Sequence, residues 1–269
     1  MQRTAATIRA LGAGALAAGL ALLQPLPACA LQPLITDDTG TQGKGGNQLE
    51  LALDRERVRS LGERETVHAL SLVYTRGLAD SLDAYFELVR SRIRSSVLGD
   101  DASGFGNPAV GFKWRLWESE PQGLSIAVKP ELQFGVSGSS ERRGLGAGRT
   151  GYAATLIVTS EHGFGEIHWN ASAARVRYDV SENRRDNRDD LYRVSVAPVF
   201  TLSPAWKVAL DAGMVTNPDR ARRARMGFVE LGAIWSPHED LELALGIIAL
   251  VGDGEPRSRT LTAGLTWRF

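Results

Sequence analysis

The chain has 269 residues, of which 43% are hydrophobic and 23% charged, with 29 glycines and one cysteine. This composition excludes a disordered tail and a disulfide-stabilised scaffold. The 31 basic and 31 acidic residues cancel, so no net field indicates nucleic acid as a partner.

The first thirty residues predict a cleaved signal peptide. Two arginines precede an apolar, alanine-rich stretch over residues 11–23, and residues 28–30, Ala-Cys-Ala, have the A-x-A form of a cleavage site. The apolar stretch is shorter than the roughly 20 residues that a membrane-spanning helix needs. Pro27 disfavours the alternative, lipidation at Cys29. Cleavage after Ala30 removes the only cysteine, and with it any disulfide, metal–thiolate or cysteine-nucleophile chemistry.

Residues 31–46 form a glycine-rich segment with the motif Thr36, Asp37, Asp38, Thr39 and Gly40. Paired carboxylates suit a hard cation, but the alternating ligands and terminal glutamate of an EF-hand loop are missing. The motif favours an Asx-type turn that leads into the first strand. The sequence leaves two places open for this segment: the periplasm, or the interior of the following domain as a small plug.

A period-two pattern over residues 47–269 predicts an all-β domain of about twelve antiparallel strands. In the clearest case, residues 124–136, Leu132 shares a face with the other apolar residues, and Glu131 and Gln133 take the opposite face. A helix would scatter these residues around its circumference. The other predicted strands lie near residues 49–53, 65–76, 82–88, 110–116, 150–160, 164–178, 192–200, 206–214, 225–236, 241–247 and 260–269.

The connections predict a transmembrane, antiparallel, up-and-down β-barrel. Short turns near residues 77–80, 118–122, 161–163, 203–205 and 236–240 alternate with longer, charged loops at residues 59–63, 92–104, 138–149, 179–190, 217–224 and 252–257. Outer-membrane barrels have such short periplasmic turns and longer outward loops. A soluble β-sandwich is the alternative, but long strands that alternate apolar with charged residues disfavour it. Pro108, Pro130 and Pro198 lie at or inside predicted strands, where bulges or strand ends are expected.

Three elements resemble one outer-membrane family, named after the meta-cleavage pathway of phenol degradation and labelled as transporters. Residues 33–45, PLITDDTGTQGKG, resemble its mature N-terminus; residues 104–114, GFGNPAVGFKW, resemble its internal Gly-x-Gly-Asp…Lys element, with Asn107 in place of the acid. Residues 261–269 resemble its closing strand, whose terminal aromatic residue is recognised by the barrel assembly machinery. The resemblance implies an outer-membrane barrel and, as a function, transport. It brings no catalytic residues.

The charged residues of the predicted strands supply candidate sites. The lumen is expected to be lined by Lys113, Arg115, Lys129, Glu131, Arg193, Lys207, Asp211 and Glu230. Because both signs occur, we expect pairing between neighbouring strands rather than a field selective for one charge. In the predicted loop at residues 217–224 and just after it, Arg220, Arg222, Arg223 and Arg225 could bind lipopolysaccharide phosphates, or could belong to an ordinary solvated loop.

These features predict an outer-membrane channel or transporter for small, aromatic or hydrophobic molecules, with no catalytic residues, metal or cofactor. A structural or adhesive barrel with a plugged lumen is the alternative. A barrel lipid hydrolase is a weaker one: His68 with a serine such as Ser91 could serve it, but no compact nucleophile–base motif is present. The expected partners are outer-membrane lipid, lipopolysaccharide, the barrel assembly machinery through the strand ending in Phe269, and a small molecule of unknown identity.

Overall fold

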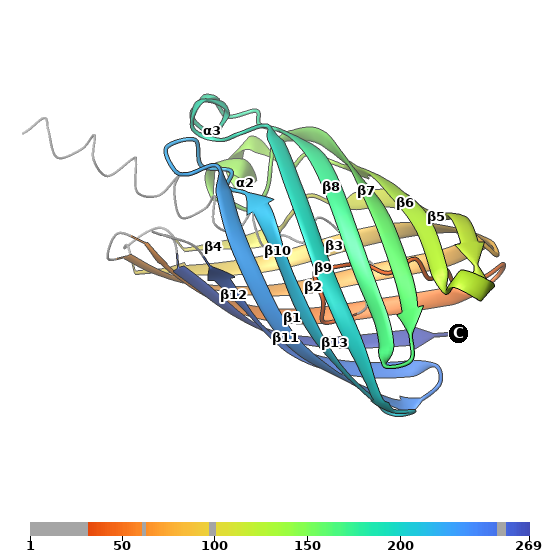
Figure 1. The fold of residues 1–269 in the computed structure, drawn as a ribbon. Helices are drawn as coiled ribbons and strands as arrows, with labels where there is room; N and C mark the ends of the chain where they lie inside the picture. Colours follow the sequence, from red (N-terminus) through yellow and green to blue (C-terminus); the bar gives the residue numbers. More distant parts are fainter. Residues whose placement is uncertain (1–31, 61–62, 97–100, 252–256) are drawn as a thin grey trace, which may run out of the picture.

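The computed structural model describes residues 32–60, 63–96, 101–251 and 257–269, so the predicted signal peptide lies outside the described residues. The described chain forms one antiparallel sheet that curls into a barrel (Figure 1). Its strands are β1 (Asn47–Ser60), β2 (Glu63–Ala79), β3 (Leu82–Ser95), β4 (Ala102–Phe105), β5 (Ala109–Ser119), β6 (Leu124–Gln133), β7 (Arg149–His162), β8 (Gly165–Arg177), β9 (Asp190–Ser203), β10 (Trp206–Thr216), β11 (Arg225–His238), β12 (Leu241–Val251) and β13 (Arg257–Arg268).

The barrel is closed and has twelve strand positions. The first strand, β1, pairs with both β2 and the last strand β13, so the sheet has no free edge there. Strands β4 and β5 occupy one position in succession, because β4 pairs with Arg90–Ile93 of β3 and β5 pairs with Leu82–Glu87. The predicted fold class is confirmed. No helix in the described residues is long and apolar enough to cross a membrane.

The prolines affect the sheet less than the sequence predicts. Pro108 lies in the break between β4 and β5, at a strand end as expected. Pro130 causes no bulge: it pairs with Ala154 of β7, and the register between β5 and β6 is the same on both sides of it. Pro198 likewise pairs in register with Ile167. The expectation of bulges at Pro130 and Pro198 is therefore wrong, because a proline that lacks one donor can leave a single rung unmade without shifting the strand.

Alternate residues of each strand face outward and form an apolar belt. In β6, Leu132 is 49% exposed, whereas the side chain of its neighbour Glu131 points inward and is 5% exposed. All six tryptophans are exposed and lie at the strand ends near short turns or the C-terminus: Trp114, Trp117, Trp169, Trp206, Trp235 and Trp267. Aromatic residues of this kind form girdles at the membrane–water interfaces of outer-membrane barrels.

The two ends of the barrel differ. At one end the strands are joined by short connections, including the 3-10 helix η1 (Glu120–Gln122); at the other lie the longer loops, two of which carry the short helices α2 (Gly138–Arg142) and α3 (Ser181–Asp186) (Figure 1). By the asymmetry of outer-membrane barrels, the end with α2 and α3 faces the outside and the tryptophan end faces the periplasm.

Phe269 completes the closure between the first and last strands. Its amide donates to the Asn47 carbonyl (3.0 Å), its carbonyl accepts from the Asn47 amide (2.9 Å), and its ring lies 4.5 Å from the ring of Trp267. We expect deletion of Phe269 to lower the amount of folded barrel in the outer membrane several-fold, because both the last rung and the exposed terminal aromatic are lost. Heat-modifiable migration of membrane fractions measures this, with Phe269→Tyr as the control that keeps an aromatic ring. Equal yields for the deletion and the wild type would contradict the prediction.

Candidate functional site: the lumen and the N-terminal segment

The inner face of the barrel is polar and densely charged. Strand residues that alternate with the apolar belt point inward, and eleven charged ones are buried: Glu50, Glu56, Glu65, Asp83, Glu87, Lys113, Lys129, Glu131, Arg193, Asp211 and Glu230. Such an interior is the reverse of a soluble sandwich core and matches the wet lumen of a membrane barrel.

Residues 32–46 lie inside this lumen. Thr36, Asp37 and Thr39 are 0–4% exposed although they belong to no helix or strand. Successive residues of the segment contact successive parts of the wall: Ile35 contacts Glu230 of β11, Thr36 contacts Asp211 of β10 and Ser195 of β9, Asp37 contacts Asn170 of β8, Thr39 contacts Thr159 of β7 and Ser125 of β6, and Gln42 contacts Asp83 of β3. The segment thus contacts strands on both sides of the lumen.

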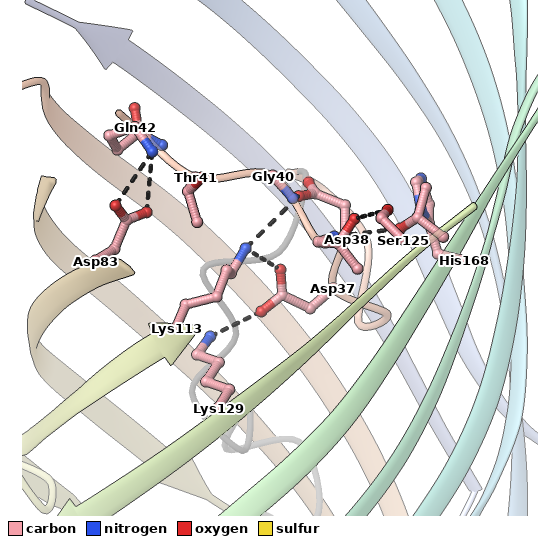
Figure 2. Close-up of polar contacts among 12 residues, drawn as sticks. Asp37, Asp38, Gly40, Thr41, Gln42, Asp83, Lys113, Ser125, Lys129 and His168 are labelled. Atoms are coloured by element: carbon pink, nitrogen blue, oxygen red, sulfur yellow. Dashed lines mark hydrogen bonds and ion pairs between the residues drawn. The ribbon is translucent and has the colours of Figure 1, made fainter. Parts of the chain in front are cut away.

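Asp37 is the centre of the strongest contacts of the segment. Its two carboxylate oxygens accept from Lys113 Nζ (2.8 Å) and Lys129 Nζ (2.9 Å), which come from neighbouring strands β5 and β6 (Figure 2). Its backbone amide donates to Asn170 Oδ1, and its carbonyl accepts from Asn170 Nδ2, both at 2.8 Å. We call Asp37, Lys113, Lys129 and Asn170 the Asp37 cluster. Because its charges are buried, loss of the Asp37 carboxylate, which both lysines contact, is expected to be costly.

Hydroxyl groups on either side of the Asp37 cluster fix the segment further. The Thr36 hydroxyl contacts Asp211 Oδ1 and Ser195 Oγ, both at 2.7 Å, and the Thr36 amide donates to Asp211 Oδ2. The Thr39 hydroxyl lies 2.5 Å from Ser125 Oγ. These hydroxyl contacts are polar, so water could replace them if the segment left the lumen. The apolar contact of the segment is made by Leu34, which is buried against Ala197, Val199 and Ala209.

The segment leaves the lumen at its C-terminal end through a close backbone crossing. Gly45 donates from its amide to the Gly77 carbonyl (2.9 Å), and a Cβ added at Gly77 would lie 1.7 Å from the Gly43 carbonyl oxygen. Only glycine therefore fits at position 77. Gly43 itself has a φ of 70°, in the left-handed region that favours glycine.

The comparisons with known proteins agree with this architecture. Residues 32–269 match the family described as "Putative MetA-pathway of phenol degradation". The chain belongs to this family. The resemblance that the sequence suggested is thereby confirmed, and the protein is an outer-membrane β-barrel.

Solved structures show the same fold. The COG4313 outer membrane channel from Pseudomonas putida F1 is 15% identical, with a TM-score of 0.70 over 86% of this chain and 98% of that chain. The transport unit of the autotransporter AIDA-I from Escherichia coli is 9% identical, with a TM-score of 0.56 over 96% and 98%. The KdgM porin in complex with disordered oligogalacturonate is 8% identical, with a TM-score of 0.52 over 82% and 99%. No curated protein matches the chain.

Most of the lumen residues predicted from the sequence lie in the interior of the barrel. Six of them are among the eleven buried charges, whereas Arg115 and Lys207 are half-buried. Arg115 bonds the Asp80 carbonyl and pairs with Glu118 near the periplasmic turns. In the N-terminal motif, Asp38 accepts from the Gly40 amide (2.6 Å), which is an Asx turn, and its carboxylate lies 3.6 Å from Lys113.

The arginines predicted to bind lipopolysaccharide are partly used within their own loop. Arg222 pairs with Asp219 (2.9 Å), and Arg220 donates to the Asn187 carbonyl across the neighbouring loop. Lipopolysaccharide binding by this loop stays a prediction.

Within the described residues, one group brings three potential metal ligands together: His238, Glu239 and Asp240, which are exposed at the end of β11 and in the turn that follows. Exposed groups of this kind are common without an ion.

Proposed function

We propose that this protein is an outer-membrane channel for small molecules, and that its own N-terminal segment forms a removable plug in the lumen. The observation that supports this most is the way residues 35–42 are held: by ion pairs and hydrogen bonds to a charged wall, with a single apolar cluster before them, where Leu34 packs on Ala197, Val199 and Ala209. The polar contacts of such a plug can be exchanged for water, so opening exposes little apolar surface beyond the small cluster around Leu34. A twelve-stranded barrel is also wider than the eight-stranded barrels that side chains fill.

For the cargo we propose small aromatic molecules that carry a polar group. The family description names phenol degradation, which supports an aromatic cargo. The polar walls support a hydroxyl or carboxylate on it, because Arg193, together with Lys113 and Lys129 once Asp37 has left them, offers donors to such groups and little to a bare hydrocarbon.

We further propose that the protein is not an enzyme. The pair His68 and Ser91 cannot act together, because His68 points outward while Ser91 is 3% exposed and points inward. Ser160 Oγ does lie 2.7 Å from His162 Nε2, at an exposed turn. In the described part of the chain, however, no carboxylate is seen to orient that imidazole, as a nucleophile–base pair requires.

A reversible disulfide between the plug and the barrel wall tests whether the plug must move for transport to occur. Thr39 and Ser125 lie close enough to be bridged as cysteines, and the mature chain beyond Cys29 has no other cysteine. We expect the T39C/S125C variant in liposomes to admit benzoate after reduction and to exclude it after oxidation. The wild type, treated with the same oxidant, should be unaffected.

Two other results would contradict the proposal in different ways. Equal flux through the oxidised and reduced variant would mean that transport does not require the plug to move. No flux above protein-free liposomes, in the wild type and in the reduced variant alike, would favour the structural or adhesive barrel instead.

A further inference from the structure

Nine arginines face outward on four neighbouring strands at the outer end of the barrel. They are Arg257 and Arg259 of β13, Arg55, Arg57 and Arg59 of β1, Arg64 of β2, and Arg90, Arg92 and Arg94 of β3, and every one is exposed. We call this surface the arginine wall. It holds nine of the 31 basic residues of a chain whose charges cancel overall. The outward positions of these strands, as far as the structure describes them, carry no aspartate or glutamate.

The arginine wall begins directly above the apolar belt. Along β1, the outward residues Leu49, Leu51 and Leu53 are followed by three arginines. Leu49 pairs with Trp267 of the periplasmic girdle, and Arg59 lies ten residues further along β1. At about 3.3 Å per residue and a strand tilt of roughly 40°, Arg59 stands about 25 Å above the girdle, which is the height of the apolar band. The wall therefore lies at the headgroups of the outer leaflet.

The register brings like charges directly opposite one another. Arg57 faces Arg259 across the β1–β13 ladder, and Arg59 faces Arg257 on one side and Arg64 on the other. His68 stands between Arg55 and Arg92 in the row below. Like charges at such positions destabilise a sheet. An anion bound between them removes this repulsion.

We propose that the arginine wall binds the phosphate groups of lipopolysaccharide, the phosphorylated glycolipid of the outer leaflet. Guanidinium groups bind phosphate in a bidentate way and are weakly hydrated, which suits them to a crowded headgroup layer. The leucines below the wall would pack on the acyl chains of the same molecule, with Leu53 60% and Leu261 58% exposed. The wall differs from the loop arginines near Arg222 because none of its members is seen in an ion pair with an acidic side chain of the described chain.

The test compares two triple variants of the full mature protein, refolded in a neutral detergent and titrated with purified lipopolysaccharide. R57Q/R59Q/R259Q removes three charges from the wall. R142Q/R184Q/R185Q removes three exposed arginines from the outer loops as a matched control. We expect the wall variant to bind about a hundredfold more weakly than the wild type, at roughly a factor of five for each arginine near an anionic surface. The control should bind like the wild type.

Heat-modifiable migration shows first that both variants are folded. Equal affinity of the two variants for lipopolysaccharide would overturn the proposal. So would equal affinity of the wild type for dephosphorylated lipopolysaccharide, because the phosphates would then not be the recognised groups. If inorganic phosphate or phosphatidylglycerol vesicles compete as well as lipopolysaccharide does, the wall is a general anion surface and the proposed lipid specificity is wrong.

Discussion

Deletion of residues 32–46 is expected to raise the single-channel conductance several-fold. These residues contact strands on both sides of the lumen, and the ion pairs of the Asp37 cluster hold the middle of the segment. The twelve strands pair with one another without help from the segment, so the barrel should stay folded when the segment is removed. Recordings in planar bilayers at equal protein amounts measure the change, with heat-modifiable migration as the check on folding.

A single substitution should reproduce part of this effect. Asp37→Asn removes the charge that faces Lys113 and Lys129, both of which are nearly fully buried. Breaking a buried pair in this way costs on the order of 3–5 kcal/mol, which should loosen the plug and increase the frequency of openings. Asp240→Asn, in an exposed periplasmic turn, removes the same charge as a control. An unchanged conductance after deletion of the segment would show that residues 32–46 do not obstruct the pore.

Leu132→Arg should impair folding into bilayers far more than Gln133→Arg, although the two residues are neighbours. Leu132 is 49% exposed on the lipid face, where an arginine costs up to about 2–4 kcal/mol, the value at the membrane centre. Gln133 faces inward, and its amide donates to Glu131 Oε1 (2.9 Å). An arginine there keeps a carboxylate beside it. Since folded domains are typically stable by about 5–15 kcal/mol, only the first variant should lose much folded protein.

The fraction of folded barrel after refolding into phospholipid vesicles, followed by urea titration, measures this difference. Leu132→Ile serves as the control for the site itself, because it keeps the apolar face. Equal losses for the two arginine variants would mean that both faces of β6 are dry, which no membrane barrel with a polar lumen allows.

The fold could be predicted well because the strands of a membrane barrel alternate lipid-facing apolar residues with lumen-facing polar residues, and this period-two pattern is visible in the sequence. Because the prediction relied on this alternation, several predicted strands are shorter than the strands of the structure. The first was expected near residues 49–53, but β1 runs from Asn47 to Ser60. Its outward residues change from leucine to arginine after Leu53, so hydrophobicity stops alternating although the strand continues. The outer ends of β3 and β13 are arginine-rich for the same reason, and the predicted loops at residues 92–104 and 252–257 take in Arg92, Arg94 and Arg257, which belong to these strands.

The contacts of the candidate site could not be predicted in this way. Asp37 is 76 residues from Lys113 and 92 from Lys129, and it meets both only because the barrel closes around it. The motif at residues 36–40 marked the segment as unusual, but its partners depend on strand register and on which side chains reach the middle of the lumen. The sequence does predict an inward-facing lysine on each of two neighbouring strands. Many other charged residues are also predicted to face inward, so this feature does not single out Lys113 and Lys129 as partners of Asp37.

The placement of the tryptophans has a consequence for how insertion can be watched. All six lie at the periplasmic end, whereas the arginine wall lies at the other. When the barrel enters from the periplasmic side, the loops with α2 and α3 must cross the bilayer first, and the indole rings reach lipid last. The tryptophan emission of this protein should therefore stay unchanged while the loops cross and shift only when the crossing is complete. The delay between protease protection of the loops and the emission shift then measures how long the crossing takes.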